Sequence, residues 1–127
     1  MDHAPGFLRV VDEARAHVRE TTVDAVRARQ ARGEAFTLLD VREDSEWSRG
    51  HIPGAVHIGR GVLERDAETV LPDPSAPIVL YCGGGFRSVL AAESLGRMGY
   101  TDVESMDGGY REWTDVGAPV DRPEPHR

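Results

Sequence analysis

The sequence contains almost no cysteine and no lysine at all. Cys82 is the only cysteine among 127 residues, which excludes an internal disulfide and argues against a zinc site. We expect neither a metal nor any other cofactor. All 15 basic residues are arginine, a bias that we read as typical of a GC-rich genome and not as evidence of function.

The chain also lacks a long apolar run and an excess of positive charge. No stretch is apolar enough to span a membrane, and the N-terminus lacks the basic and then apolar pattern of a signal peptide. The net charge is −7, so neither nucleic acid nor a membrane is expected as a partner. These properties predict a cytoplasmic protein with one core, in a reducing compartment that keeps Cys82 as a thiol.

The most informative stretch runs from Ile78 to Ser88 and reads IVLYCGGGFRS. Its first four residues form a short β-prone apolar run, which indicates a buried strand. The glycines that follow Cys82 let the backbone curl so that several N–H groups point inward. A helix expected from Ser88 to Met98 directs its N-terminal N–H groups to the same point. The stretch therefore predicts an anion-binding loop around the sulfur of Cys82.

A cysteine in such a loop is expected to be a thiolate and a nucleophile near neutral pH. Arg87 closes the loop and can add a permanent positive charge with planar donors. No general base is needed beside Cys82, because the thiolate is already formed. The alternative is a buried, inert thiol, and the three glycines followed by Arg87 argue against it.

Strands and helices are expected to alternate along the chain, which favours a parallel sheet with helices on both faces. Ligands of such sheets bind at the carboxyl ends of the strands, where Cys82 lies. The predicted strands are 36–41, 55–58, 78–81 and 103–106, and the predicted helices are 7–18, 22–32, 44–50, 61–71, 88–98 and 110–116, followed by an open tail.

Two predicted helices have features of their own. The helix over 7–18 has one apolar face, so we expect it to pack on the outside of the domain; docking onto a partner is the alternative. Thr21 and Asp24 have the spacing of a capping box, which predicts the start of the next helix near Thr22.

Four strings of residues, taken in order, resemble those of single-domain rhodaneses. They are LDVRE at 39–43, GHIPGA at 50–55, YC at 81–82 with RS at 87–88, and GGYREW at 108–113. The resemblance covers residues 19–117, leaving an N-terminal helical extension over 1–18 and a C-terminal tail over 118–127. It implies an α/β, rhodanese-like fold with a central, mainly parallel five-stranded sheet and helices on both faces.

The resemblance further implies sulfur transfer. Rhodaneses move a sulfane sulfur from a small anionic donor such as thiosulfate to a cysteine, here Cys82, and then to cyanide or to a thiol, which a protein can supply. The anionic sulfur would be held by the backbone N–H groups of the loop residues Gly83, Gly84, Gly85, Phe86, Arg87 and Ser88. A sulfur-relay or protein-binding module without turnover is the alternative.

Loop length separates this chain from related phosphatases and arsenate reductases. Four residues lie between Cys82 and Arg87; the related enzymes have one more, which widens the loop for a tetrahedral oxyanion. The shorter loop favours a sulfur atom. Many thiosulfate-active rhodaneses carry extra basic residues in this loop, whereas here Gly83 to Gly85 are uncharged, so we expect slow turnover with thiosulfate or a different donor.

Other residues at the same sheet edge are expected to support the site. Asp40 and Arg42 are predicted to form an ion pair or capping bonds that hold the loop, with a direct role in the site as the alternative. His51 is expected to fix its turn by hydrogen bonding, and less readily to act in catalysis. Arg60 is a candidate for the pocket rim, and Phe86 for the pocket wall.

Overall fold

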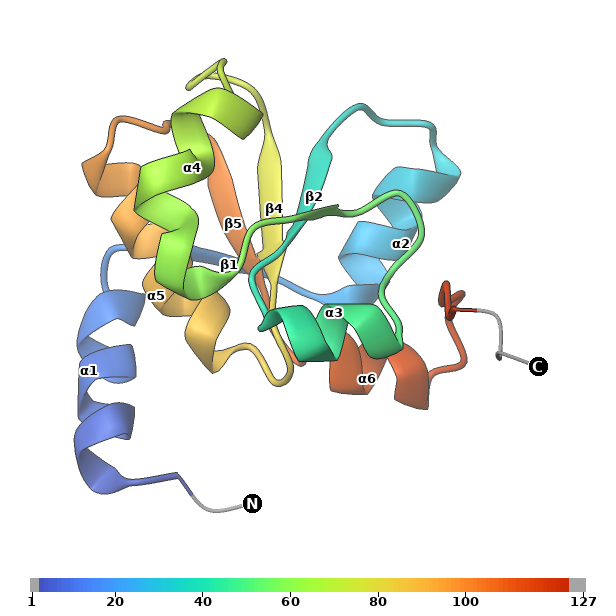
Figure 1. Cartoon of the computed structure of the whole chain (residues 1–127), viewed down its shortest axis with the longest axis horizontal. Helices are drawn as coiled ribbons and strands as arrows, with labels where there is room; N and C mark the ends of the chain where they lie inside the picture. Colours follow the sequence, from blue (N-terminus) through green and yellow to red (C-terminus); the bar gives the residue numbers. More distant parts are fainter. Residues whose placement is uncertain (1–2, 124–127) are drawn as a thin grey trace.

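The computed structural model describes residues 3–123 of the chain and contains one five-stranded sheet. The spatial order is β1-β5-β4-β2-β3, and every neighbouring pair is parallel. Figure 1 shows the helices wrapped around this sheet. The strands are β1 (Arg19–Thr21), β2 (Thr37–Asp40), β3 (Val56–His57), β4 (Ile78–Tyr81) and β5 (Val103–Met106). This confirms the predicted α/β fold with a parallel sheet.

The helices cover both faces of the sheet, as the alternation of elements predicted. They are α1 (Pro5–Arg15), α2 (Val23–Ala31), α3 (Asp44–Arg49), α4 (Leu63–Val70) preceded by a 3₁₀ turn (Arg60–Val62), α5 (Phe86–Arg97) and α6 (Gly109–Asp115).

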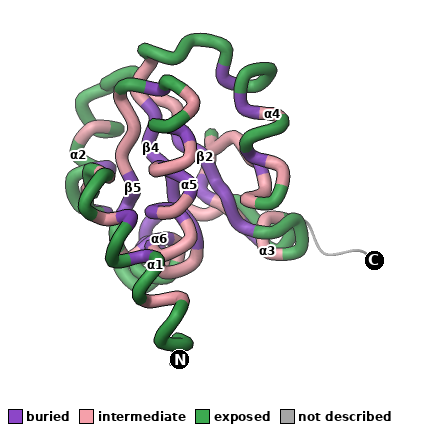
Figure 2. Tube along the Cα trace, turned by 90° about the vertical axis from the view of Figure 1, so that its left-hand side faces the viewer, coloured by how far each residue is buried: buried purple, intermediate pink, exposed green. Residues whose placement is uncertain are grey.

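β4 lies in the middle of the sheet, and its four residues are all buried. Ile78 and Leu80 point to the core formed with α4 and α5, whereas Val79 and Tyr81 point to the core formed with α2 and α6. This alternation follows from the two-residue period of a strand. Figure 2 shows the buried strands enclosed by helices that are exposed on their outer sides. Because β4 is the central strand, Cys82 lies in the middle of the row formed by the carboxyl-terminal ends of the strands.

Three sequence predictions are wrong in detail. Arg19–Thr21 is a strand that was not predicted, since its residues are polar and mostly exposed and only the pairing with β5 defines it. Thr22, not Thr21, caps α2, because the Thr22 side chain accepts a hydrogen bond from Ala25 N–H. The tail is not open over 118–121, since Asp121 pairs with His51 through the backbone and Pro119 accepts a hydrogen bond from Trp113. Residues 124–127 lie outside the described part of the chain.

Candidate active site

The loop after β4 folds around the sulfur of Cys82. The backbone N–H groups of Gly85 and Ser88 donate to Sγ at 3.2 and 3.3 Å, and Ser88 Oγ lies 3.5 Å away. Gly85 has φ of +99°, a conformation that favours glycine, and it directly precedes α5. The sulfur therefore faces two amide hydrogens at the N-terminus of a twelve-residue helix, where an anionic sulfur is stabilised.

The carbonyl groups of the same loop are held on the opposite side, by α6. Tyr110 N–H donates to the carbonyl of Cys82 at 2.8 Å, and Arg111 N–H donates to the carbonyl of Gly83 at 2.9 Å. A Cβ at Gly109, where φ is +56°, would lie 2.5 Å from the Cys82 carbonyl oxygen. Glycine is needed at this position because the two backbones touch there. Because α6 binds these two carbonyl groups, they point away from the sulfur, and the loop amides are left to face it.

Cys82 is only 1% exposed, but it lies at the bottom of a cavity of about 610 Å³. The cavity is far larger than a single sulfur atom. Its charged lining comes from α3, α5 and α6, and its apolar lining includes the N-terminal segment. The lining residues are His3, Phe7, Glu46, Cys82, Gly83, Gly84, Phe86, Arg87, Gly108, Arg111, Glu112 and Asp115.

An aromatic cluster forms one wall of this cavity. The ring of Phe86 lies 4.5 Å from that of His3 and 6.1 Å from that of Phe7, measured between centroids. The wall is fixed because α1 buries Val11 and Ala14 against Val89 of α5. The prediction that this helix packs on the outside of the domain is confirmed, and Phe86 lines the pocket as proposed. The contribution of His3 and Phe7 was missed, because no local pattern reveals which part of the domain a terminal helix covers.

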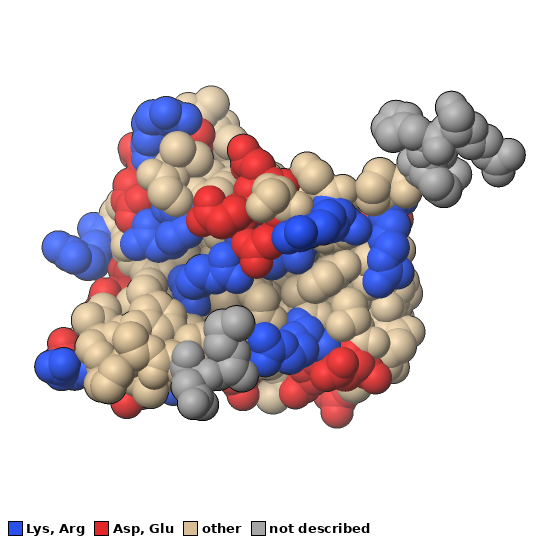
Figure 3. Space-filling model, turned by 60° about the horizontal axis from the view of Figure 1, so that its bottom comes forward, with Lys and Arg blue, Asp and Glu red and all other residues tan. Residues whose placement is uncertain are grey.

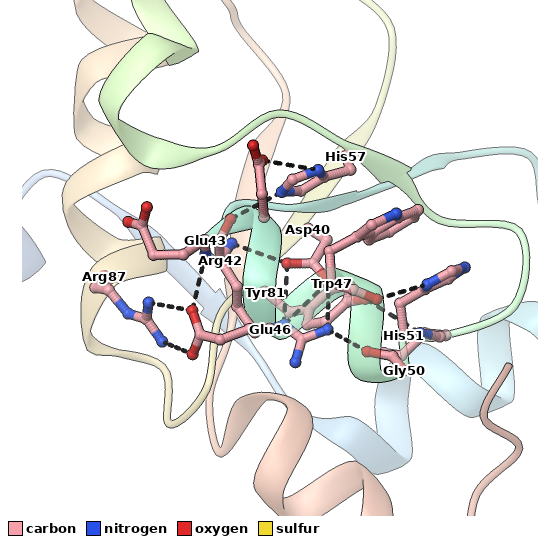
Figure 4. A network of polar contacts seen from close by, with 12 residues as sticks. Asp40, Arg42, Glu43, Glu46, Trp47, Gly50, His51, His57, Tyr81 and Arg87 are labelled. Atoms are coloured by element: carbon pink, nitrogen blue, oxygen red, sulfur yellow. Dashed lines mark hydrogen bonds and ion pairs between the residues drawn. The ribbon is translucent and has the colours of Figure 1, made fainter. Parts of the chain in front are cut away.

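Arg87 points to an acidic partner that the sequence did not reveal. Its guanidinium donates to both carboxylate oxygens of Glu46 in α3, at 2.8 and 3.0 Å (Figure 4). These hydrogen bonds lower the pKa of Glu46 to about 2 and raise the pKa of Arg87. Glu46 also accepts from the N–H of Glu43 in a capping box. Arg87 thus ties the loop to α3, and its charge is largely balanced.

Asp40 and Arg42 form the predicted ion pair, which is buried. Arg42 Nη2 lies 2.8 Å from Asp40 Oδ2 and also donates to the carbonyl of Gly50 at 2.7 Å. Burial disfavours the charged guanidinium, but the hydrogen bonds and charge of Asp40 outweigh this and raise the pKa of Arg42. The pair links the end of β2 to the end of α3. Neither residue lines the cavity around Cys82.

His51 and Arg60 lie away from Cys82. The ring of His51 stacks on Trp47 at 3.5 Å between centroids, and its Nδ1 lies 3.3 Å from the carbonyl of Trp47, which agrees with a role in holding its turn. Arg60 does not line the cavity around Cys82, contrary to expectation; its guanidinium donates to Glu64 and to Ser94. The helical spacing to Glu64 draws it to α4 instead of to the rim.

Within residues 3–123, no three His, Cys, Asp or Glu side chains are grouped so that they could bind a metal ion. In the same range, no helix combines the length and apolar character that crossing a lipid bilayer requires.

Fold and site together define a parallel α/β domain that carries one cysteine in an amide-lined loop at the end of its central strand. The chain belongs to the family of rhodanese-like domains, whose model, named Rhodanese-like domain, matches residues 22–116. The resemblance to rhodaneses that the four sequence strings indicated is thus confirmed.

Two curated relatives carry names that refer to sulfur. The thiosulfate sulfurtransferase GlpE of Pseudomonas paraeruginosa is 36% identical over 90 residues, which cover 70% of this chain and 79% of the relative. The putative sulfur carrier protein YrkF of Bacillus subtilis is 32% identical over 102 residues, which cover 80% of this chain. The match spans only 54% of the YrkF sequence, so about half of that relative has no counterpart here.

One similar solved structure includes the N-terminal part of the chain. It is a protein of unknown function from Rhodopseudomonas palustris, described as a possible tyrosine phosphatase, with 29% identity and a TM-score of 0.83. The match covers 95% of this chain and 98% of that one. The likeness in fold therefore extends beyond the residues that the family model covers.

Proposed function

We propose that the protein is a sulfurtransferase that carries a sulfane sulfur as a persulfide on Cys82. The observation that supports this most directly is the pair of amide hydrogens, from Gly85 and Ser88, that donate to Sγ at the bottom of an open cavity. These donors are placed before the reaction and therefore need no reorganisation when negative charge gathers on sulfur. The names of the curated relatives agree with sulfur chemistry.

The reaction with thiosulfate takes two displacements at sulfur. The Cys82 thiolate attacks the outer sulfur of thiosulfate; a new S–S bond forms, the old S–S bond breaks, and sulfite leaves with the electron pair. An acceptor, either cyanide or a thiolate, then attacks the terminal sulfur of the persulfide. The S–S bond to Cys82 breaks and the thiolate is restored. No proton transfer to or from a protein side chain is required.

The loop amides that do not contact Sγ have a function in this scheme. A persulfide places its charge on the outer sulfur, one bond further into the cavity, where the remaining N–H groups of Gly83, Gly84, Phe86 and Arg87 would receive it. Arg87 gives less help with a dianionic donor, because Glu46 balances its charge. Thiosulfate is accordingly a weak donor in this proposal, and a donor of lower charge is favoured.

Two other functions of the same loop remain to be separated from this one. A sulfur relay that delivers its sulfur once per encounter is favoured by the name of the Bacillus subtilis relative, a putative sulfur carrier. Phosphatase action is raised by the description of the Rhodopseudomonas palustris protein. The loop of four residues between Cys82 and Arg87 argues against it, since a tetrahedral phosphate needs a wider loop.

The proposal is tested by mass spectrometry of the intact protein after incubation with thiosulfate. We expect one added sulfur atom, removed again by cyanide, and no addition in Cys82→Ser. Steady-state formation of thiocyanate then distinguishes turnover from a single delivery, and an aryl phosphate assay tests the phosphatase. Activity that survives in Cys82→Ser, or a wild-type protein that never takes up sulfur from thiosulfate or an organic persulfide, would contradict the mechanism.

A further inference from the structure

A second, smaller groove adjoins the active-site cavity. It has a volume of about 300 Å³ and lies where the C-terminal end of α3 meets α6. Glu46 lines both the groove and the cavity around Cys82, so the two are neighbours across this side chain. We call it the arginine groove; it is lined by Arg42, Glu46, Arg49, Gly50, Tyr110 and Arg122.

Arg42 presents one unused end to this groove. Its side chain is only 5% exposed, and its Nε and Nη2 atoms are taken by Asp40 and by the carbonyl of Gly50. Within residues 3–123, Nη1 has no hydrogen-bond partner, and Figure 4 shows it directed away from both of these groups. The Cζ atom of Arg42 lies over the ring of Tyr110, 4.1 Å from the ring centroid. Nη1 is not among the buried side-chain atoms that lack a partner, so it is accessible from the groove and can donate to an acceptor from outside the chain.

The groove has an excess of positive charge in an acidic protein. Neither Arg49 nor Arg122 forms an ion pair with any of residues 3–123. The acid in the lining, Glu46, already accepts from Arg87 through both oxygens, so it does not neutralise them. Figure 3 shows arginine side chains forming a band across this face of the molecule. With a net charge of −7 for the whole chain, this local excess is a property of the groove.

We propose that the arginine groove binds a carboxylate of the acceptor thiol while the sulfur of the same acceptor reaches Cys82. The inference rests on the proposed function and names the class of acceptor: a low-molecular-weight thiol that carries a carboxylate. A guanidinium presents planar, paired donors that match a carboxylate. Cyanide cannot extend into the groove, and a neutral thiol gains nothing from it.

The test compares acceptors in the complete protein, with glutathione as the carboxylate-bearing thiol and 2-mercaptoethanol as the neutral one. In the double variant Arg49→Gln/Arg122→Gln, the KM for glutathione should rise about tenfold, equivalent to ~1.4 kcal/mol. The KM for 2-mercaptoethanol and the rate with cyanide should stay unchanged. The matched control is Arg65→Gln/Arg97→Gln, which removes two exposed arginines that line neither the cavity nor the groove and should leave all three acceptors unaffected.

A binding measurement separates this proposal from the proposed function. S-methylglutathione cannot accept sulfur, so calorimetric titration reports on the groove even if no sulfur transfer occurs. We expect it to bind the wild type more tightly than the Arg49→Gln/Arg122→Gln variant, and to bind the control like the wild type. The groove proposal would be overturned if S-methylglutathione bound the wild type and the Arg49→Gln/Arg122→Gln variant equally well, or did not bind the wild type. It would also be overturned if the variant raised the KM for glutathione and for 2-mercaptoethanol by the same factor. Binding without any persulfide on Cys82 would overturn the proposed function alone.

Discussion

Glu46 and Arg87 link the loop around Cys82 to α3, and the link depends on pH. The hydrogen bonds from Arg87 lower the pKa of Glu46 from its ordinary 4.5 to about 2. A carboxylate with a lowered pKa in the folded state stabilises the protein fully above its ordinary pKa, and this contribution is lost as the pH falls towards the folded-state value. The ion pair should therefore stabilise the protein equally at pH 6 and pH 8.

The first prediction follows from this pair. Glu46→Gln should lower the free energy of unfolding by about 1 kcal/mol at pH 7, because both side chains remain partly exposed. The difference from the wild type should shrink between pH 4.5 and 2, as wild-type Glu46 takes up a proton. Urea unfolding at a series of pH values measures both. Glu13→Gln, an exposed change on α1, should show neither effect, and a difference that is independent of pH would contradict the assignment.

At the scale of single residues, the sequence predicted the loop around Cys82 but not everything that surrounds it. Cys82, its glycines and Arg87 are contiguous, so local patterns could place them together. Glu46 lies 41 residues before Arg87 in the chain, and only the packing of α3 below the end of the sheet brings the two into contact. Residues such as Glu46 and His3 become site residues through tertiary structure, and a single sequence contains no periodic signal for them.

α6 is the element that gives the loop its conformation. The N–H groups of its first turn hold the carbonyls of Cys82 and Gly83. The strand β1 shows the same dependence on neighbours: its three residues are polar, and they form a strand because β5 offers a free edge. Elements with their own apolar pattern, such as β4 and α5, could be predicted from sequence, whereas elements defined by what lies beside them could not.

The second prediction concerns the contact between α6 and the loop. Gly109→Ala should destabilise the protein by roughly 3 kcal/mol, because it combines a positive φ with a Cβ 2.5 Å from the Cys82 carbonyl oxygen. Sulfur transfer should fall as well, since the carbonyls must move. Gly96→Ala is the matched control: its Cβ would meet nothing within 4 Å, and in the last turn of α5 it should stabilise by at most ~0.5 kcal/mol. Thermal unfolding measures the change in stability, and the persulfide assay measures the change in sulfur transfer. Equal stability of the two variants would refute the close contact.

On the scale of the whole molecule, segments on both sides of the family-matched region pack onto the domain. The family model begins at residue 22 and ends at residue 116, yet α1 before it is anchored in the core and Asp121 after it pairs with His51. Figure 1 shows α1 alongside α5, the helix that begins at the loop around Cys82. We therefore propose that α1 is an integral part of this domain and of its pocket. The sequence could predict the helix and its apolar face, but not that its first residues reach the site.

The third prediction tests this with two adjacent valines. Val11 is fully buried between α1 and α5, whereas Val10 is 53% exposed. Val11→Ala should lower the free energy of unfolding by ~2 kcal/mol, and Val10→Ala should change it by less than about 0.5 kcal/mol. Chemical unfolding should remain a single transition in both variants. If Val11→Ala proves neutral, or if α1 unfolds in a separate step, the helix is an appendage and not part of the domain.

The depth of the sulfur has a consequence for how this protein would meet oxidants. Two thiols can join only when their Cβ atoms approach to about 4 Å, and Cys82 is 1% exposed at the bottom of its cavity. At this depth we do not expect the sulfur atoms of two copies to approach so closely, and neither copy holds a second thiol with which to form an internal disulfide. We therefore expect no covalent dimer through Cys82, and under the proposed function a sulfur atom carried there would leave only with an acceptor group narrow enough to enter the cavity.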